Sequence, residues 1–497
     1  MRQIQHWIDG HSTAGTAKRV GPVFNPATGE QTGEVSFASA DDVDLAVKAA
    51  RAAFDTWRFS SLAQRQNVMF AYRELVAARR MDFARLLTAE HGKTIDDAMG
   101  EVQRGLEVIE FACNIAHLLK GDFSEQVSTG VDTYTIRQPL GVVAGITPFN
   151  FPAMVPMWMY PIAIACGNTF VLKPSEKDPS SSLLAAELLA EAGLPEGVFN
   201  VIHGDKEAVD ALLTHPLVAA ISFVGSTPIA RYIYETGTRS GKRVQALGGA
   251  KNHMIVLPDA DMDLAADAAV SAGYGSAGER CMAISAIVAV GDGGDGLIER
   301  MRARIEKLKV GPGDETGVEM GPLVTKQHLD KVRGYVSEGE AAGAVLVADG
   351  RGLVVPGHED GFFLGPTLFD RVSTDMSIYT DEIFGPVLST VRMEHYEEAI
   401  RLINENPYGN GTAVFTNDGG AARKFQAEVQ VGMVGINVPI PVPLSFYSFG
   451  GWKESIFGSH AIYGPEGVHF YSRQKVVISR WADPIHRGVD LGFPTHG

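Results

Sequence analysis

The chain of 497 residues is 45% hydrophobic and 21% charged, the balance of a globular protein with apolar material for sizeable cores, and its length predicts roughly two to four domains. Its formal net charge of −16 repels nucleic-acid backbones and anionic membranes, so neither is an expected partner. The cysteines, Cys113, Cys166 and Cys281, form no disulfide framework and suit a reducing compartment. The first residues, "MRQIQHWIDGHSTAG", lack the apolar run of a signal peptide, so we expect a cytoplasmic protein.

The first part of the chain is predicted to be largely helical. Residues 41–57 place apolar side chains at i, i+3, i+4 and i+7, and Ser39 precedes them as an N-cap. Two further helical stretches follow, "QRQNVMFAYRELVAARRMDFARLLTAEHG" and "IDDAMGEVQRGLEVIEFACNIAHLL".

From residue 141 onward, buried strands alternate with helices. The uncharged stretch 139–172 has the length of a membrane span, but prolines at 148, 152, 156 and 161 interrupt it. We interpret it as a strand, a turn, a short helix and a second strand, all buried. The apolar segments "VFNVIHG", "VAAISFVGS" and "RVQALGG" then alternate with amphipathic helices, which predicts a doubly wound parallel sheet.

A second α/β unit is predicted to begin near residue 248. Its strands are "HMIVLP" and "AISAIVAVG", and its helices are "DMDLAADAAVSAGYGSAG" and "GLIERMRARIEKLKV". Near the end, "VHFYSRQKVVISRW" alternates like an exposed strand, which predicts pairing with residues 124–138 and a role in association. The polar, Gly-rich "HRGVDLGFPTHG" is expected to be loosely held.

Two turns of the first unit are candidate nucleotide contacts, because ligands of doubly wound sheets bind at the carboxyl ends of strands. In "FVGSTPIAR", Gly225 permits close approach of a ligand, and Ser226 or Thr227 could cap the next helix; an ordinary capped turn explains this segment equally well. In "LKPSEKDP", Lys173 and Glu176 follow a strand, where a carboxylate can bind ribose hydroxyls, although a charged surface loop is an even alternative.

Cys281 is the candidate nucleophile in "GSAGERCMAIS", but a lone cysteine is more often a small apolar filler. The histidines show no His-Glu-x-x-His or Cys/His spacing, so no metal site is predicted.

Six segments in a fixed order resemble one family. They are "TPFNFP" (147–152), "LKPSE" (172–176), "GLPEGVFNVIHG" (193–204), "FVGST" (223–227), "GERC" (278–281) and "EIFGPV" (382–387). Together they closely resemble the aldehyde dehydrogenase superfamily over nearly the whole chain. The segments "GERCMAIS" and "GINVPIPVPL" look most like the methylmalonate-semialdehyde dehydrogenases, the acylating, CoA-dependent branch.

The resemblance implies an α/β fold of the aldehyde dehydrogenase type, with two doubly wound parallel-sheet domains plus a β oligomerisation arm, assembled as a homotetramer. The implied division is an NAD-binding domain (1–123 and 143–247), a catalytic domain (248–460) and the arm (124–142 and 461–490).

The resemblance also implies the site residues. Cys281 looks like the nucleophile, and Asn150 looks like the side-chain donor of the oxyanion hole. The residues implied for the cofactor are Thr147, Phe149, Lys173, Glu176, Lys177, Gly225, Ser226 and Glu382. A carboxylate at Glu176 would repel a 2′-phosphate, which favours NAD over NADP.

Arg104 and Arg280 match the arginines that hold the substrate carboxylate in the methylmalonate-semialdehyde enzymes, since a guanidinium fork fits a carboxylate. Taken without the resemblance, Arg104 is more simply a solvated charge on a helix.

The acyl acceptor is inferred from a departure from the family pattern. Hydrolytic relatives carry a Glu-Leu-Gly-Gly-Lys stretch whose Glu activates water, whereas this chain reads "VQALGGAKNH" and places Leu247, or Ala246 in another register, at that position. Without a base for water, a CoA thiol is the expected acceptor. The products would be propionyl-CoA or acetyl-CoA, formed with loss of CO₂ in valine catabolism or in inositol or β-alanine breakdown. The alternatives are a hydrolytic enzyme that gives a free acid, with Glu279 as the base, and a non-catalytic relative.

Overall fold

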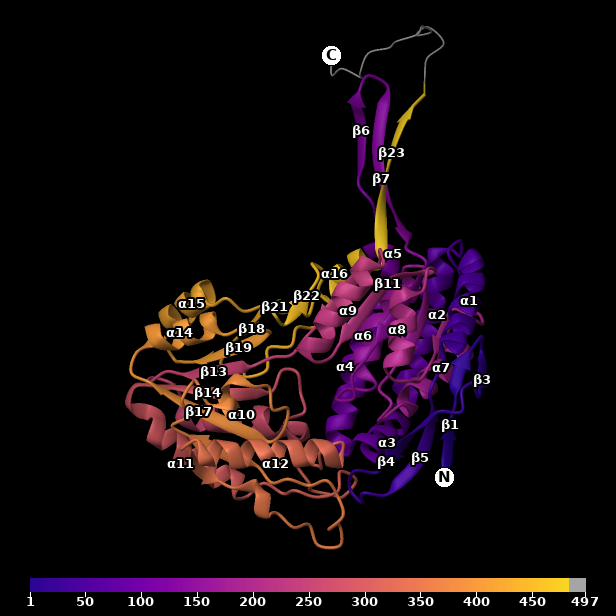
Figure 1. Ribbon diagram of the computed structural model, residues 1–497. Coiled ribbons are helices and arrows are strands. Elements are labelled where there is room, and N and C mark those ends of the chain that lie inside the picture. Colours follow the sequence, from indigo (N-terminus) through magenta and orange to yellow (C-terminus); the bar gives the residue numbers. More distant parts are fainter. Residues whose placement is uncertain (482–497) are drawn as a thin grey trace.

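Two large sheets organise the computed structural model, which describes residues 1–481 (Figure 1). The eight-stranded sheet has the order β22 (Ile456–Phe457), β12 (Arg243–Leu247), β11 (Val218–Val224), β8 (Val142–Ile146), β9 (Thr169–Lys173), β10 (Phe199–Val201), β2 (His6–Ile8) and β3 (His11–Thr13). The seven-stranded sheet has the order β15 (Val345–Ala348), β16 (Thr367–Asp370), β17 (Val387–Met393), β14 (Ile284–Val290), β13 (Asn252–Val256), β19 (Gly411–Phe415) and β20 (Met433–Ile436). The chain passes from one sheet to the other between Leu247 and Asn252.

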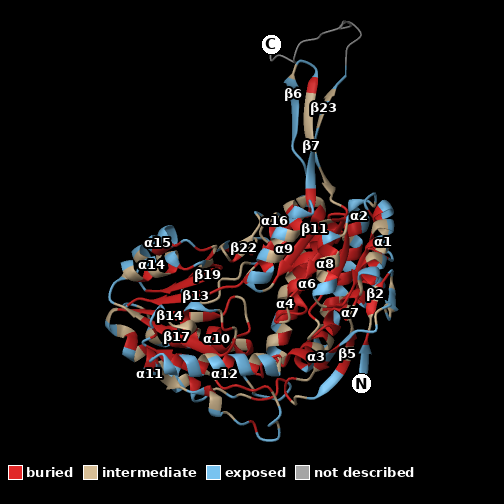
Figure 2. Cartoon of the chain, viewed as in Figure 1, coloured by how far each residue is buried: buried red, intermediate tan, exposed pale blue. Residues whose placement is uncertain are grey.

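Helices cover both faces of the first sheet (Figure 2). The strands β8 and β9 within it are therefore buried along their whole length. Alternate residues of β8 point into different cores: Val143 packs in one, Val142 and Ala144 in the other. The first core is closed by α2 (Leu62–Ala78), α3 (Arg80–His91), α4 (Ile95–Cys113), α5 (Ile115–Leu118), α6 (Met154–Ala165) and α7 (Ser180–Glu191). The second is closed by α1 (Ala40–Trp57), α8 (Lys206–Thr214) and α9 (Thr227–Arg239).

The register of this sheet brings three chain segments to one edge. Ile146 at the end of β8 pairs with Lys173 of β9 and with Phe223 of β11, all in parallel. The turns that follow these strands therefore leave the sheet side by side. The interpretation of residues 139–172 from the sequence is a strand, a turn, a short helix and a second strand. That interpretation is confirmed by β8, α6 and β9. Among the described residues, no helix combines the length and apolar character needed to cross a bilayer.

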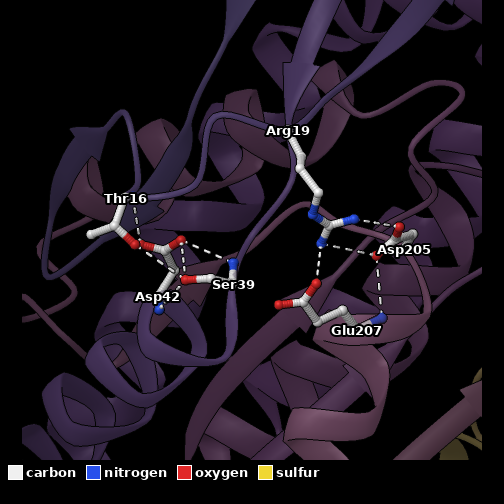
Figure 3. Close-up of polar contacts among 6 residues, drawn as sticks. All are labelled: Thr16, Arg19, Ser39, Asp42, Asp205 and Glu207. Atoms are coloured by element: carbon white, nitrogen blue, oxygen red, sulfur yellow. Dashed lines mark hydrogen bonds and ion pairs between the residues drawn. The ribbon is translucent and has the colours of Figure 1, made fainter.

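The predicted cap of α1 is present. Ser39 Oγ accepts a hydrogen bond from Asp42 N at 3.2 Å, and Asp42 Oδ2 accepts one from Ser39 N at 2.9 Å, which makes a reciprocal capping box (Figure 3). Burial would raise the pKa of Asp42, but hydrogen bonds from Ser39 and Thr16 outweigh it and lower the pKa to about 2.

The segment before α1 is tied to the start of α8 by Arg19. Its guanidinium contacts Asp205 at 2.7 Å and Glu207 at 2.6 Å (Figure 3). Asp205 is also the N-cap of α8, so the ion pairs hold this helix terminus beside the N-terminal strands β4 (Val20–Phe24) and β5 (Gln31–Ser36), which form a small sheet with β1 (Arg2–Ile4).

The second sheet is also covered on both faces. On one face lie α10 (Met262–Tyr274), α11 (Gly294–Ile305), α12 (Lys326–Ala341) and α13 (Ser377–Thr380); on the other lie α14 (Tyr396–Glu405) and α15 (Gly419–Glu428). The helix expected to run through "DMDLAADAAVSAGYGSAG" is shorter than predicted. It ends at Tyr274, and a 3₁₀ turn over Gly275–Gly278 follows because Ser276 and Ala277 adopt left-handed backbone angles, with φ of 53° and 52°.

A three-stranded antiparallel sheet projects from the body of the molecule (Figure 1). It comprises β6 (Phe123–Ser128), β7 (Val131–Pro139) and β23 (Ser472–Arg480), and β23 pairs with β7 from Ser472↔Pro139 to Arg480↔Val131. The predicted pairing of the C-terminal strand with residues 124–138 is confirmed. Part of the predicted arm (482–490) and the tail "HRGVDLGFPTHG" lie outside the described residues.

Candidate active site

The loop that carries Cys281 is bent sharply and held by side-chain amides. Residues Ser276, Ala277 and Gly278 all have positive φ, a costly conformation for residues with a side chain. The carbonyl of Cys281 accepts hydrogen bonds from Asn252 Nδ2 at 2.9 Å and from Asn410 Nδ2 at 3.1 Å. The two asparagines come from the start of β13 and from the residue before β19, so the second sheet fixes the backbone at the cysteine.

A cavity of about 500 Å³ brings the predicted nucleophile and both predicted arginines together. Its charged and polar lining is Asp97, Glu101, Gln103, Arg104 and Arg280, and its apolar lining includes Phe151, Met154, Trp158, Cys281, Met282, Ile440 and Val442. We call it the substrate cavity. A small, mostly apolar chamber with guanidinium groups suits a short aldehyde that bears a carboxylate.

Arg104 is held by one side chain and two backbone carbonyls. Arg104 Nη1 donates to Glu107 Oε2 at 2.7 Å, and its Nη2 donates to the carbonyls of Val442 (3.3 Å) and Pro443 (2.9 Å). Arg104 therefore ties α4 to the loop that closes the cavity, and is not the freely solvated helix charge that its sequence context alone suggests.

A second cavity, of about 590 Å³, lies along the carboxyl ends of β8, β9 and β11. We call it the cofactor cavity. Seven of the eight residues predicted to bind the cofactor line it: Thr147, Phe149, Lys173, Glu176, Lys177, Gly225 and Ser226. The eighth, Glu382, instead shares a small pocket with Cys281.

The charged groups of the cofactor cavity suit a nucleotide. Lys173 Nζ donates to Glu176 Oε2 at 3.2 Å. Burial would raise the pKa of Glu176, but Lys173 and Lys177 outweigh it, so the pKa is lowered and the group is a carboxylate able to accept from hydroxyls. The Lys177 ammonium lies 4.5 Å above the ring centre of Phe149.

The predicted side-chain cap of α9 is not formed. Ser226 occupies the N-cap position with extended backbone, but its hydroxyl makes no capping hydrogen bond, and Thr227 Oγ1 accepts from Gly249 N at 2.8 Å instead. Thr227 thereby joins this turn to the segment after β12. The amides at the start of α9 thus lack a side-chain cap, which suits a phosphate.

The segment around Asn150 is fixed by a fully buried ion pair that sequence reasoning missed. Lys93 Nζ donates to Glu101 Oε2 at 2.6 Å and to the carbonyl of Asn150 at 2.7 Å. Glu101 Oε1 accepts from the amides of Ala153 (2.8 Å) and Met154 (3.1 Å), where α6 begins. A carboxylate at a helix N-terminus is favourable, and this one holds the segment that carries Asn150.

Leu247, at the position expected to carry a water-activating base, is apolar, whereas the carboxylate of Glu382 shares the small pocket with Cys281. Leu247 ends β12, is 3% exposed and packs in the same apolar core as Met282 and Trp158, against which Cys281 also packs. The alternative base, Glu279, is fully buried: its Oε1 accepts from Val324 N at 3.4 Å, and its Oε2 lies 3.7 Å from His91 Nε2. Burial raises the pKa of Glu279 to about 8. Glu279 lines neither cavity that Cys281 lines.

Burial, and then the negative charge of Glu382, raise the pKa of Cys281 to about 12. Because the thiolate is the reactive form, we expect alkylation of Cys281 by iodoacetamide to speed up about tenfold per pH unit between about pH 7 and 9. Glu382→Gln should raise the rate at each pH, because it removes the charge that raises the thiol pKa. Peptide mapping by mass spectrometry measures the rate at each cysteine.

Cys113 and Cys166 act as internal controls in this measurement. They are 2% and 1% exposed, and burial raises their pKa values to about 11 and about 12. A rate at Cys281 that levels off below about pH 8 would contradict the elevated pKa of the thiol.

Among residues 1–481, no group of His, Cys, Asp and Glu side chains is arranged to hold a metal ion. The structure instead brings together a half-buried thiol, two guanidinium groups and a nucleotide-sized cavity beside the edge of a parallel sheet.

Comparison with known proteins agrees with this arrangement. A model described as "Aldehyde dehydrogenase family" matches residues 12–477. The chain is 56% identical to a malonate-semialdehyde dehydrogenase of Pseudomonas aeruginosa over 100% of both chains. It is 48% identical to an acylating methylmalonate-semialdehyde dehydrogenase of Arabidopsis thaliana over 95% of this chain and 78% of the relative. A crystal structure from Sinorhizobium meliloti, assigned as a methylmalonate-semialdehyde dehydrogenase and complexed with NAD, superposes with a TM-score of 0.97 at 53% identity, over 98% of this chain and 99% of that one.

Proposed function

This chain belongs to the aldehyde dehydrogenase family, and we propose that it oxidises malonate or methylmalonate semialdehyde with NAD and transfers the acyl group to CoA. The observation that carries the proposal is the substrate cavity, in which Cys281 lies with Arg104 and Arg280. The relatives named for these semialdehydes support it. We assign cofactor binding to residues 1–123 and 143–247 and the nucleophile to a catalytic domain, 248–460.

The cofactor cavity fits NAD. Glu176 supplies a carboxylate for ribose hydroxyls, and the amides at the start of α9, beside Gly225 and Ser226, suit the pyrophosphate. Thr147 and Phe149 would flank the nicotinamide, and Glu382 would accept from its ribose. When bound, NAD supplies the hydride acceptor, and these side chains orient it.

In the substrate cavity, Arg280 and Arg104 would bind the carboxylate and so place the aldehyde carbon against the sulfur of Cys281. Cys281 reacts as its thiolate, after its proton passes to water: the sulfur adds to that carbon, the C=O π bond breaks, and the oxygen becomes an oxyanion. The side-chain amide of Asn150 and the backbone N–H of Cys281 would donate to the oxyanion. After oxidation, the acyl group is a thioester on Cys281.

We infer the acyl acceptor from the residue at the expected position of the water-activating base. Leu247 cannot take a proton from water, and Glu279 is buried and lines neither cavity that Cys281 lines. A CoA thiolate attacks the thioester carbon instead, the Cys281 thiolate leaves, and acyl-CoA is released. Loss of CO₂ from the β-carboxylate before this transfer would give acetyl-CoA from malonate semialdehyde and propionyl-CoA from its methyl homologue.

Omitting CoA tests this proposal. With NAD and malonate semialdehyde alone, we expect a burst of about one NADH per site and then a stop, because the thioester persists. Addition of CoA should restore steady turnover. Absorbance follows NADH, and mass spectrometry identifies the acyl-CoA.

Full turnover without CoA, with a free acid as product, would replace the acylating reaction by the hydrolytic alternative. No NADH with either semialdehyde would favour a non-catalytic relative. Comparing initial rates on the two semialdehydes with CoA present would place the enzyme in valine catabolism or in inositol or β-alanine breakdown.

We also propose that the projecting sheet is an oligomerisation arm and that the protein is a cytoplasmic homotetramer. The exposed face of β23 carries Val476 and Ile478, 58% and 70% exposed, and Trp481 beside it is 89% exposed. Light scattering after size exclusion should give the mass of four chains. In a variant that carries both Val476→Asp and Ile478→Asp, the measured mass should be lower. An unchanged mass in that variant would contradict the role of the arm.

A further inference from the structure

Arg280 lies between two cavities. One is the substrate cavity, and the other, also of about 500 Å³, is lined by α4, α10 and α11 and includes Lys307 and Glu319. Both are lined by Asp97 and Arg280. A flexible guanidinium at such a boundary has two spaces to occupy, so something must determine which one it points into.

Asp97 is the group that holds it. Arg280 Nη2 donates to Asp97 Oδ1 at 2.7 Å, and this is the one hydrogen bond of the Arg280 side chain among the described residues. The pair is partly buried, with 22% and 18% of the side chains exposed. A guanidinium has five N–H donors, so Arg280 keeps donors for a carboxylate. Arg104, by contrast, already donates to one side chain and two backbone carbonyls.

The backbone of Asp97 is held at the start of α4. This residue lies in the first turn of α4, where its backbone N–H donates to Thr94 Oγ1 at 3.2 Å. It lies four residues before Glu101 and seven before Arg104, so the three share one face of the helix, and all three line the substrate cavity.

Gly275 lies against the Arg280 guanidinium and lines the second cavity but not the substrate cavity. A Cβ added to Gly275 would lie 2.5 Å from Arg280 Nη1 and 2.6 Å from its Cζ. The glycine therefore makes room for the guanidinium. An alanine there would displace the end of a flexible side chain and leave the backbone in place, because φ of Gly275 is −53°.

We propose that Asp97 and Gly275 form a clamp that fixes the Arg280 guanidinium at the boundary of the substrate cavity and thereby sets selectivity for aldehydes with a carboxylate. The inference rests on the proposed function, since it assigns a role in binding the substrate carboxylate. Asp97 and Gly275 are positioning residues, which act through Arg280.

The test compares malonate semialdehyde with propanal, which has the same carbon chain and no carboxylate. For Asp97→Ala and for Gly275→Ala, we expect KM for malonate semialdehyde to rise about ten- to a hundredfold, as for a lost charge-assisted contact. The kcat for malonate semialdehyde and the kcat/KM for propanal should stay within about threefold of wild type. Asp97→Asn, which keeps an acceptor for Arg280, should give a smaller rise in KM.

Asp96→Ala is the matched control. Asp96 is an exposed acid in the same first turn of α4 and lines neither cavity, so its loss removes the same helix-terminal charge without touching Arg280. It should leave both substrates unaffected.

Two results separate the clamp from the proposed function. A wild-type enzyme that does not prefer malonate semialdehyde over propanal would overturn the proposed substrate class and the clamp with it. A wild-type preference that survives in both Asp97→Ala and Gly275→Ala, or an equal loss on both substrates, would overturn the clamp alone.

Discussion

Replacing Cys281 with alanine is expected to lower kcat with malonate semialdehyde, NAD and CoA by at least about 10⁴-fold, since the sulfur is the only atom proposed to bond to the substrate. The fold should survive, because the side chain is small and the backbone carbonyl keeps its contacts with Asn252 and Asn410. NADH formation gives the rate, and NAD binding by calorimetry shows that the cofactor cavity is intact.

Cys113→Ala is the matched control for this prediction. Cys113 is a buried thiol at the end of α4, away from both cavities. It should change stability slightly and kcat little. Substantial turnover by Cys281→Ala would remove the covalent mechanism.

Replacing Asn150 with alanine is expected to lower kcat about 10²–10³-fold, the usual effect of losing one donor to an oxyanion. The affinity for NAD should change little, because Asn150 is not among the residues that line the cofactor cavity. Asn150→Asp should also lower kcat, since it replaces the amide donor by a negatively charged carboxylate of nearly equal size.

The backbone of Asn150 is held by Lys93, so a substitution of Lys93 tests the position of Asn150 in the same experiment. Lys93→Met removes the ammonium that donates to the Asn150 carbonyl and leaves Glu101 without its ion-pair partner. Burying an unpaired carboxylate lowers stability, so its thermal midpoint must be measured beside kcat. A kcat within about threefold of wild type in Asn150→Ala would show that the oxyanion is held by other donors.

Much of the fold was predictable because its signals are local. The apolar runs of β8, β9 and β11 alternate with amphipathic helices, and Ser39 before a 3.6-residue apolar period marks the cap of α1. The sequence predictions were wrong at the start of α9 and at the end of α10. Ser226 has the residue type and position of a cap, yet its hydroxyl forms no such bond, and α10 ends early at residues with left-handed backbone angles.

The residues of the candidate site were also predictable only where their signals are local. Cys281, Arg280 and the turns after β8, β9 and β11 lie within short recognisable motifs. Glu101 and Asp97 do not, because a charge on a helix is ordinarily solvated, and nothing local shows that Lys93 or Arg280 lies opposite. Asn252 and Asn410 were missed for a similar reason: their common target is the backbone of Cys281, 29 and 129 residues away.

One helix, α4, carries Asp97, Glu101 and Arg104 on the same face, and its periodicity limits the sequence changes that this enzyme can accept. Each residue of an α-helix turns the chain by about 100°. Inserting one residue between positions 97 and 101 would rotate Asp97 away from Glu101 and Arg104. Asp97, which holds Arg280, would then no longer lie on the same helix face as Glu101, which holds the segment of Asn150. Variants that accept new aldehydes should therefore arise by substitution on α4 and by changes in the loop at 440–443, while the length of the helix stays constant.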